Sequence, residues 1–197
     1  MKSRRLRVIV GIVVGAAIGV TLGIWAGNKF RAADSEPKVK MLIVYYSHTG
    51  NAKFVAEHIQ SLTGADVYEL KPTDPYPEDF GVTVARVGQE KEAGVLPELS
   101  GKINNLADYD VIFLGTPNWY GTLSMPMLSF LNSYDLSGKT IVPFITFGRG
   151  GLMNTITDLN ALAPNATILE AFGVSSDNVK DSQPDVTQWL ERIGILK

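Results

Sequence analysis

The stretch Met41–Ala52 reads MLIVYYSHTGNA: an apolar run, a turn of small and polar residues, and the start of a helix. The run Met41–Tyr46 has no charged interruption, which is expected of a strand buried on both faces of a sheet. The following pattern over Asn51–Leu62 places apolar side chains on one helical face, and Gly64 is a stop signal. A buried strand joined by a short turn to a helix indicates an α/β fold.

The same alternation continues to the end of the chain. Further strands are predicted over Asp66–Leu70, Val111–Gly115, Thr140–Phe147 and Ala166–Val174, and further helices over Phe80–Glu92, Pro126–Ser133, Leu152–Leu162 and Val186–Ile195. Strands that alternate with helices pair in parallel through right-handed crossovers. We therefore predict a doubly wound, five-stranded parallel sheet between two helical layers, a three-layer α/β/α domain.

Two features strain this prediction. Pro143 lies inside the fourth strand, although proline cannot donate to a β-ladder. The connection from Lys71 to Asp110 is long, and a connection of that length often covers a site.

Composition excludes several kinds of chemistry. The 197 residues include no Cys and only two His, so disulfides, iron–sulfur clusters and histidine-rich metal sites are not expected, and we predict no metal site. Residues 41–197 hold ten Lys or Arg and eighteen Asp or Glu, a net charge of −8. Such a domain repels phosphate backbones, and we expect no nucleic-acid partner.

The beginning of the chain has the opposite charge. Residues 1–40 hold eight Lys or Arg and two acids, and residues 8–27 carry no charge. A helix over residues 8–27 would be about 30 Å long, the thickness of a bilayer core. We predict one N-terminal hydrophobic helix that acts as an anchor or export signal over residues 1–27, a linker over 28–40, and the α/β domain over 41–197.

The hydrophobic segment also suggests a location. No small-x-small cleavage pattern ends it, which favours an uncleaved anchor, and the short basic start favours an N-terminus inside the cell. The expected location is therefore the cell membrane, as a single-pass protein with its domain outside the cytoplasm. Glycines recur at positions 11, 15, 19, 23 and 27, which indicates either self-association through this helix or accidental spacing in a signal region.

The turn after the first strand has the composition of an anion site. It consists of Ser47, His48, Thr49, Gly50, Asn51 and Ala52, at the carboxyl edge of the predicted sheet, where ligands of open α/β sheets bind. Backbone N–H groups at a helix N-terminus attract anions, and the hydroxyls can donate to phosphate oxygens. Because the loop has no Lys or Arg, it suits one phosphate group better than a triphosphate. The alternative interpretation is an ordinary helix cap.

Two further loops follow strands that end at the same edge. They combine aromatic side chains with glycines and contain Pro117, Asn118, Trp119, Tyr120 and Gly121, and Phe147, Gly148, Arg149 and Gly150. Aromatic side chains can stack on a flat ring while backbone groups bond its polar edge. With the first loop they predict a site for a planar heterocycle that bears one phosphate, although Trp119 and Phe147 could also be core residues.

These residues carry a resemblance to a known family. From Met41 to Lys197 the chain resembles the flavodoxins, whose phosphate loop reads Thr or Ser, any residue, Thr, Gly, any residue, Thr; here the last position is Ala52. The segments Val111–Gly121 and Gly138–Gly151 are similar to those of one short-chain subgroup. The resemblance implies a strand order of 2-1-3-4-5 and FMN as cofactor. It further implies that residues 47–52 hold the phosphate, that residues 117–121 and 147–150 flank the isoalloxazine, and that Trp119 or Tyr120 stacks on the ring.

Three functions follow from this interpretation. The first is a membrane-tethered FMN electron carrier that serves a redox partner protein. The second is an FMN-dependent NAD(P)H or quinone reductase, with the Lys71–Asp110 connection shaping a pocket for a small acceptor such as a quinone. The third is a non-redox interaction module that binds FMN weakly because Ala52 lacks a hydroxyl. None of the three assigns a catalytic side chain.

Overall fold

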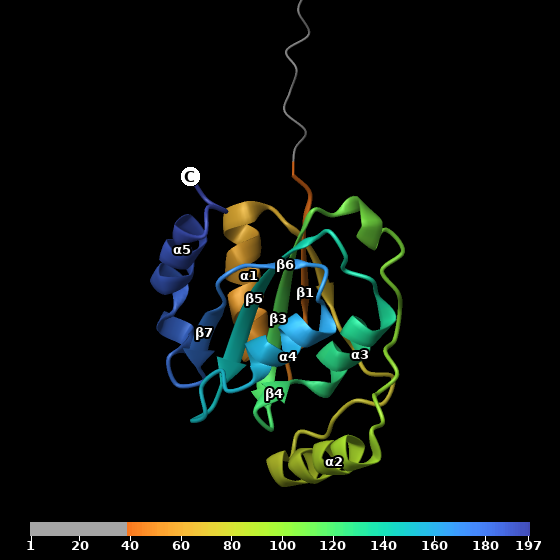
Figure 1. The fold of residues 1–197 in the computed structure, drawn as a ribbon. Helices are drawn as coiled ribbons and strands as arrows, with labels where there is room; N and C mark the ends of the chain where they lie inside the picture. Colours follow the sequence, from red (N-terminus) through yellow and green to blue (C-terminus); the bar gives the residue numbers. More distant parts are fainter. Residues whose placement is uncertain (1–38) are drawn as a thin grey trace, which may run out of the picture. The chain divides into compact units, whose positions relative to one another are not determined.

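The computed structural model describes residues 39–197 (Figure 1). The predicted hydrophobic helix over residues 8–27, its glycine repeat and nearly all of the predicted linker lie outside these residues. Between residues 39 and 197, no helix combines the length and the apolar character needed to cross a bilayer.

The centre of the domain is a parallel sheet. Its main path runs β2 (Asp66–Glu69), β1 (Met41–Tyr45), β3 (Val111–Trp119), β5 (Thr140–Phe147) and β6 (Thr167–Ile168). A further strand, β7 (Phe172–Ser175), also pairs with β5 in parallel. The sheet has seven strands where five were predicted, because the fifth is split into β6 and β7 and the short strand β4 (Thr122–Leu123) pairs with β3. With β4 left out and β6 and β7 counted as one strand, the order corresponds to the predicted 2-1-3-4-5, and the predicted fold class is confirmed.

The predicted fifth strand, Ala166–Val174, is broken in two because of Pro143. β6 pairs with β5 up to Ile141, and β7 pairs with it again from Phe144 onwards. The carbonyl groups of Ile141 and Phe147 accept bonds on this side of β5, so by the alternation along a strand Pro143 faces the same side. The missing N–H of Pro143 thus lies opposite the gap between β6 and β7, where it interrupts no ladder bond.

Helices cover both faces of the sheet, as predicted. One face packs against α1 (Asn51–Thr63) and α5 (Gln183–Arg192), and the other against α3 (Met125–Ser133) and α4 (Thr155–Leu162). Short 3₁₀ turns lie at Leu106–Asp108 and Val179–Asp181. α4 begins three residues later than predicted because Leu152–Asn154 form a turn in which Met153 has a φ of 44°.

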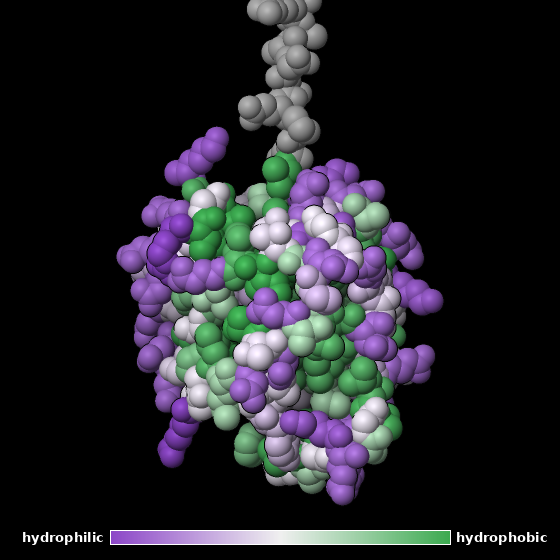
Figure 2. Space-filling model, viewed as in Figure 1, coloured by the Kyte–Doolittle hydropathy of each residue, from purple (hydrophilic) through white to green (hydrophobic). Residues whose placement is uncertain are grey.

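The helix of the long connection, α2 (Phe80–Ala93), lies apart from both layers. Figure 1 shows it beyond the carboxyl edge of the sheet, below β4 (Thr122–Leu123). The Asp79 side chain caps it by accepting a hydrogen bond from the N–H of Val82. Apolar residues reach the surface over α2 in the space-filling view (Figure 2), and Phe80 is 79% exposed. α2 therefore stands over the edge at which the predicted site lies.

Strand β3 is longer than predicted and ends in a hairpin. It continues through Trp119 and turns into β4 by antiparallel pairing of Trp119 with Thr122. The two turn residues, Tyr120 and Gly121, have φ values of 50° and 81°. Positive φ at both central positions is typical of the type I′ hairpin turn, in which Gly is favoured and a tyrosine is unusual.

The middle of β3 depends on the absence of a side chain at Gly115. A Cβ at that position would lie 2.1 Å from the Phe144 ring and 2.8 Å from the Tyr45 Cβ. Gly115 thus leaves room for Phe144, which is completely buried in the core shared by the sheet, α1 and α5.

We predict that Gly115→Ala lowers the free energy of unfolding by about 1–3 kcal/mol, the usual cost of overpacking a core. Denaturant unfolding of the purified chain measures this. Gly148→Ala is the matched control, since a Cβ there would have no atom within 4 Å. Equal stability of Gly115→Ala and the parent chain would contradict the packing described here.

Candidate functional site

The turn between β1 and α1 leaves several hydrogen-bond donors without partners. Gly50 caps α1 in the left-handed region, with a φ of 87°, and no side chain caps this helix. Within residues 39–197, the N–H groups of residues 48–51 donate no backbone hydrogen bond. Free N–H groups at a helix N-terminus form an anion site.

Ser47 gives a second observation at the same turn. Its Oγ is the one buried side-chain oxygen or nitrogen in residues 39–197 that has no hydrogen-bond partner. Buried polar groups are normally paired, and an unpaired one indicates a missing ligand, ion or water. A phosphate oxygen would supply the acceptor, so the turn fits the phosphate of FMN. Ala52, the last residue of the predicted phosphate loop, is 1% exposed and packs into the core.

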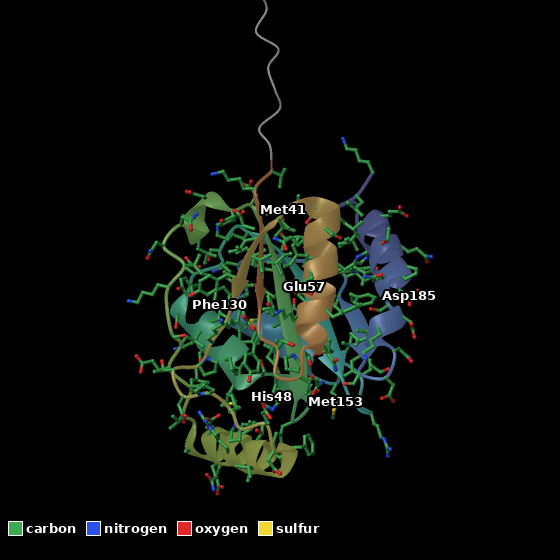
Figure 3. The ribbon with its side chains drawn as sticks, turned by 180° about the vertical axis from the view of Figure 1, so that it is seen from behind. Met41, His48, Glu57, Phe130, Met153 and Asp185 are labelled. Carbon is green, nitrogen blue, oxygen red and sulfur yellow. The ribbon has the colours of Figure 1, made fainter. Side chains whose placement is uncertain are left out.

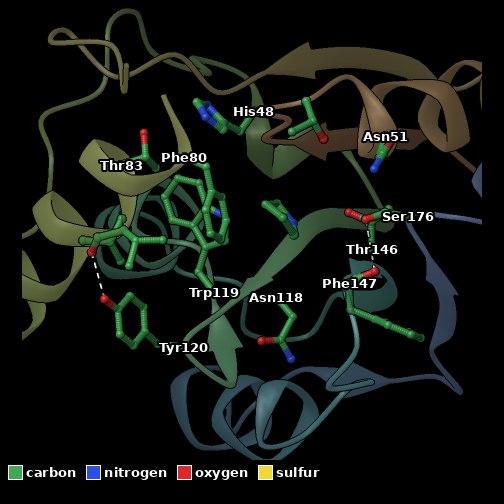
Figure 4. A pocket seen from close by; sticks show the side chains of 15 residues that line it. His48, Asn51, Phe80, Thr83, Asn118, Trp119, Tyr120, Thr146, Phe147 and Ser176 are labelled. Atoms are coloured by element: carbon green, nitrogen blue, oxygen red, sulfur yellow. Dashed lines mark hydrogen bonds between the residues drawn. The ribbon is translucent and has the colours of Figure 1, made fainter. Parts of the chain in front are cut away.

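The turn after β1, the end of β3 with its hairpin turn, and the end of β5 with the loop that follows meet around one cavity of about 270 Å³ (Figure 4). Nine of the fifteen predicted site residues line it: His48, Thr49, Asn51, Pro117, Asn118, Trp119, Tyr120, Phe147 and Gly148. Figure 3 shows from behind that His48 and Met153 lie at the same edge of the sheet, near α2. The structure therefore brings all three predicted loops together.

Six predicted residues do not line this cavity: Ser47, Gly50, Ala52, Gly121, Arg149 and Gly150. Ser47 borders a neighbouring hollow that shares His48 with the cavity, and Gly50 forms the turn itself. Gly121 belongs to the hairpin turn, while Arg149 is exposed. Gly150 lies against Met153, whose Sδ would be 3.0 Å from an added Cβ.

The structure also adds residues that the sequence analysis did not assign. The lining includes Phe80, Thr83, Val84 and Val87 from α2, and Thr146 and Ser176 from the ends of β5 and β7. The length of the Lys71–Asp110 connection indicated that this segment covers a site. No local sequence pattern, however, identifies which of its side chains line the cavity. No Asp, Glu, Lys or Arg lines the cavity, so a neutral planar group suits it.

Trp119 stands in an aromatic cluster on one side of the cavity. Its ring centroid lies 4.9 Å from that of Tyr76, 5.4 Å from Tyr46 and 5.9 Å from His48, each in an edge-to-face arrangement. These contacts fix the orientation of the indole. Trp119 is thus a rigid wall, whereas Tyr120 extends away from it towards α2.

Asn118 joins two of the loops. Its Nδ2 donates to the carbonyl oxygens of Gly151 and Leu152, at 2.9 and 3.1 Å, and its Oδ1 accepts from the N–H of Gly121. The side-chain amide is thus used within the protein, and Asn118 positions the loops.

Arg86 attaches α2 to the segment that precedes it. Its Nε donates to Glu90 at 2.9 Å, its guanidinium contacts Asp74 at 3.0 Å, and its Cζ lies 4.2 Å above the Tyr76 ring. The Tyr76 hydroxyl donates to Glu90 in turn. This polar cluster, Asp74, Tyr76, Arg86 and Glu90, fixes the α2 side of the cavity.

Comparison with known proteins agrees with this architecture. A family model described as flavodoxin matches residues 40–193. In the crystal structure of a Bacteroides eggerthii protein assigned to the flavoproteins, the similarity covers 78% of this chain and 97% of that chain, at 28% identity and a TM-score of 0.69. A Lactobacillus acidophilus flavoprotein, crystallised in complex with FMN, matches 74% of this chain and 99% of its own at 23% identity, with a TM-score of 0.61.

The fold and the edge at which its loops meet define a flavodoxin-like domain. Because the family model spans most of the chain, this protein belongs to the flavodoxin family.

Buried tyrosines make the stability of the domain depend on pH in the alkaline range. Burial, followed by the charge of Glu69, raises the pKa of Tyr45 to about 12. Burial also raises the pKa of Tyr46, and burial together with the hydrogen bond to Glu90 raises the pKa of Tyr76. In the unfolded chain these hydroxyls ionise near pH 10.

We predict that the free energy of unfolding falls as the pH rises from about 10 to 12, because the unfolded chain releases protons that the folded chain retains. Denaturant unfolding at fixed pH steps measures the slope. Tyr45→Phe should reduce the slope, because it removes one of the hydroxyls whose pKa the folded chain raises. An identical slope for Tyr45→Phe and the parent chain would contradict a raised pKa for Tyr45 in the folded domain.

Proposed function

We propose that this protein is an FMN-binding electron-transfer protein, tethered to the membrane by the hydrophobic segment over residues 8–27. The observation that carries the proposal is the turn after β1 on a flavodoxin fold, where Ser47 Oγ and the helix N-terminus find no partner among residues 39–197. The FMN seen in the Lactobacillus acidophilus flavoprotein supports the choice of cofactor. When bound, FMN would supply the redox chemistry.

The chain itself binds and orients the cofactor. Ser47, Thr49 and the N–H groups of residues 48–51 would hold the phosphate, and the loops at 117–121 and 147–150 would flank the ring system. Trp119 and Phe147 give the cavity apolar walls that exclude water from one side of such a ring. No protein side chain is required to transfer a proton in this proposal.

The charge of the domain favours a basic partner. With a net charge of −8 over residues 41–197, it attracts basic protein surfaces and disfavours further negative charge in the cavity. We expect a redox partner protein with a positive docking face, and self-association through the glycine repeat remains part of the proposal for the membrane segment.

One observation favours a second candidate function, an FMN-dependent reductase of a small acceptor. Phe80, Val84 and Val87 from α2 form an uncharged, mostly apolar side of the cavity. Such a lining suits a neutral aromatic acceptor of the quinone class.

Steady-state assays separate the two functions. The FMN-loaded carrier should oxidise NAD(P)H with a quinone only when a reductase is added. Rapid turnover without any added reductase would show that the protein is a reductase and not an electron carrier. A purified chain that takes up no FMN from solution would overturn both.

We predict that Ser47→Ala and Thr49→Ala each weaken FMN binding by about 1–3 kcal/mol, the cost of an unmet hydrogen bond in a buried site. Fluorescence titration of FMN measures the dissociation constant. In the ligand-free chain Ser47→Ala should not lower the stability, because the Ser47 Oγ makes no hydrogen bond within the part of the chain that the structure describes. Ser61→Ala, at the far end of α1, is the control with unchanged binding. Unchanged affinity in both loop variants would contradict the phosphate assignment.

A further inference from the structure

Tyr120 occupies a position that its backbone does not favour. It is the first central residue of the hairpin turn between β3 and β4, with a φ of 50°, and its side chain is 54% exposed. Asn, Asp and Gly are preferred at this position because a Cβ disfavours positive φ. Neither the geometry of the turn nor the exposure of the side chain to solvent therefore explains why a tyrosine occupies this position.

The side chain of Tyr120 instead reaches α2 (Figure 4). Its hydroxyl donates a 2.8 Å hydrogen bond to the carbonyl oxygen of Val84, although the two residues are 36 positions apart. A Cβ on Gly88 would lie 3.1 Å from this hydroxyl, and Lys91 Nζ lies 5.3 Å from the ring centroid. Residues 84, 88 and 91 follow one face of the helix, so Tyr120 lies along that face, and Gly88 gives it room.

α2 has few other attachments. Only Thr83 and Val87 are buried along its length. Its other contacts with the preceding segment are polar: Arg86 contacts Asp74, Glu90 accepts a hydrogen bond from Tyr76, and the Thr83 hydroxyl donates to the carbonyl oxygen of Pro77. An element with so little apolar burial opens at a lower free energy than the core. Yet Thr83, Val84 and Val87 line the cavity, so an opening of α2 uncovers the proposed flavin site.

We propose that Tyr120 is a latch that holds α2 over the cavity, and that its hydroxyl sets the rate at which FMN enters and leaves. The inference rests on the proposed function for the identity of the ligand. In this assignment Tyr120 is a positioning residue and does not stack on the flavin. The latch acts on the closed domain with and without ligand, and therefore changes rates more than affinity.

Hydrogen exchange of the ligand-free chain tests the latch without FMN. In Tyr120→Phe, which removes only the hydroxyl, the amides of α2 should exchange about three- to tenfold faster while those of α1 do not change, as expected for the loss of one hydrogen bond. Tyr120→Asn should give at least the same acceleration, and because Asn favours this turn the domain stays folded.

Tyr109→Phe is the matched control. It removes a tyrosine hydroxyl that donates to Asp66, the first residue of β2. This substitution should leave the exchange of the α2 amides unchanged. If α2 exchanges at the parent rate in both Tyr120 variants, the latch does not exist.

Stopped-flow binding adds the second readout. Tyr120→Phe should raise the FMN association and dissociation rate constants by the same three- to tenfold factor, with the dissociation constant within about twofold of the parent value. If Tyr120→Phe has a larger dissociation constant but an unchanged association rate constant, Tyr120 contacts the flavin directly and the latch is overturned. If the parent chain binds no FMN, the proposed function fails, while the exchange experiment still decides on the latch.

Discussion

The site depends on one constraint: the first helix begins with N–H groups that nothing in the described domain satisfies. Gly50 takes the left-handed conformation at the start of α1, and as a glycine it has no side chain that could cap the helix. Ala52, Val55 and Ile59 bury the same helix against the sheet, so its N-terminus cannot shift to find other partners. The donors are thereby fixed at the carboxyl edge, where an anion can reach them.

The second determinant is the way α2 is held. The helices on the two faces of the sheet pack through apolar side chains, whereas α2 is attached mainly by polar contacts. Arg86 and Glu90 bind the preceding segment through Asp74 and Tyr76, and Tyr120 binds the carbonyl oxygen of Val84. Polar attachments in contact with water are individually weak. The domain thus combines a turn fixed against the core with a helix held by weaker contacts, a combination that suits the proposed flavin site.

Much of this arrangement could be predicted from the sequence, and the remainder depends on contacts between distant residues. The unbroken apolar run Met41–Tyr46 predicted a buried parallel strand, and the rule for carboxyl edges placed the loops that follow β1, β3 and β5 together. Pro143 indicated an irregularity in the predicted fourth strand, but the break lies in the strand beside it, between β6 and β7. Tyr120 shows the limit most clearly: its hydrogen bond to the carbonyl oxygen of Val84 joins two residues that only the tertiary fold brings together, and no sequence pattern predicts it.

The most direct measurement compares the affinity of the purified chain for FMN and for riboflavin, which differ only in the phosphate, by calorimetric titration under the same conditions. We expect FMN to bind at least tenfold more tightly, because charge-assisted hydrogen bonds contribute about 1.5–3 kcal/mol each. Equal affinities for the two flavins would show that the turn after β1 does not bind a phosphate.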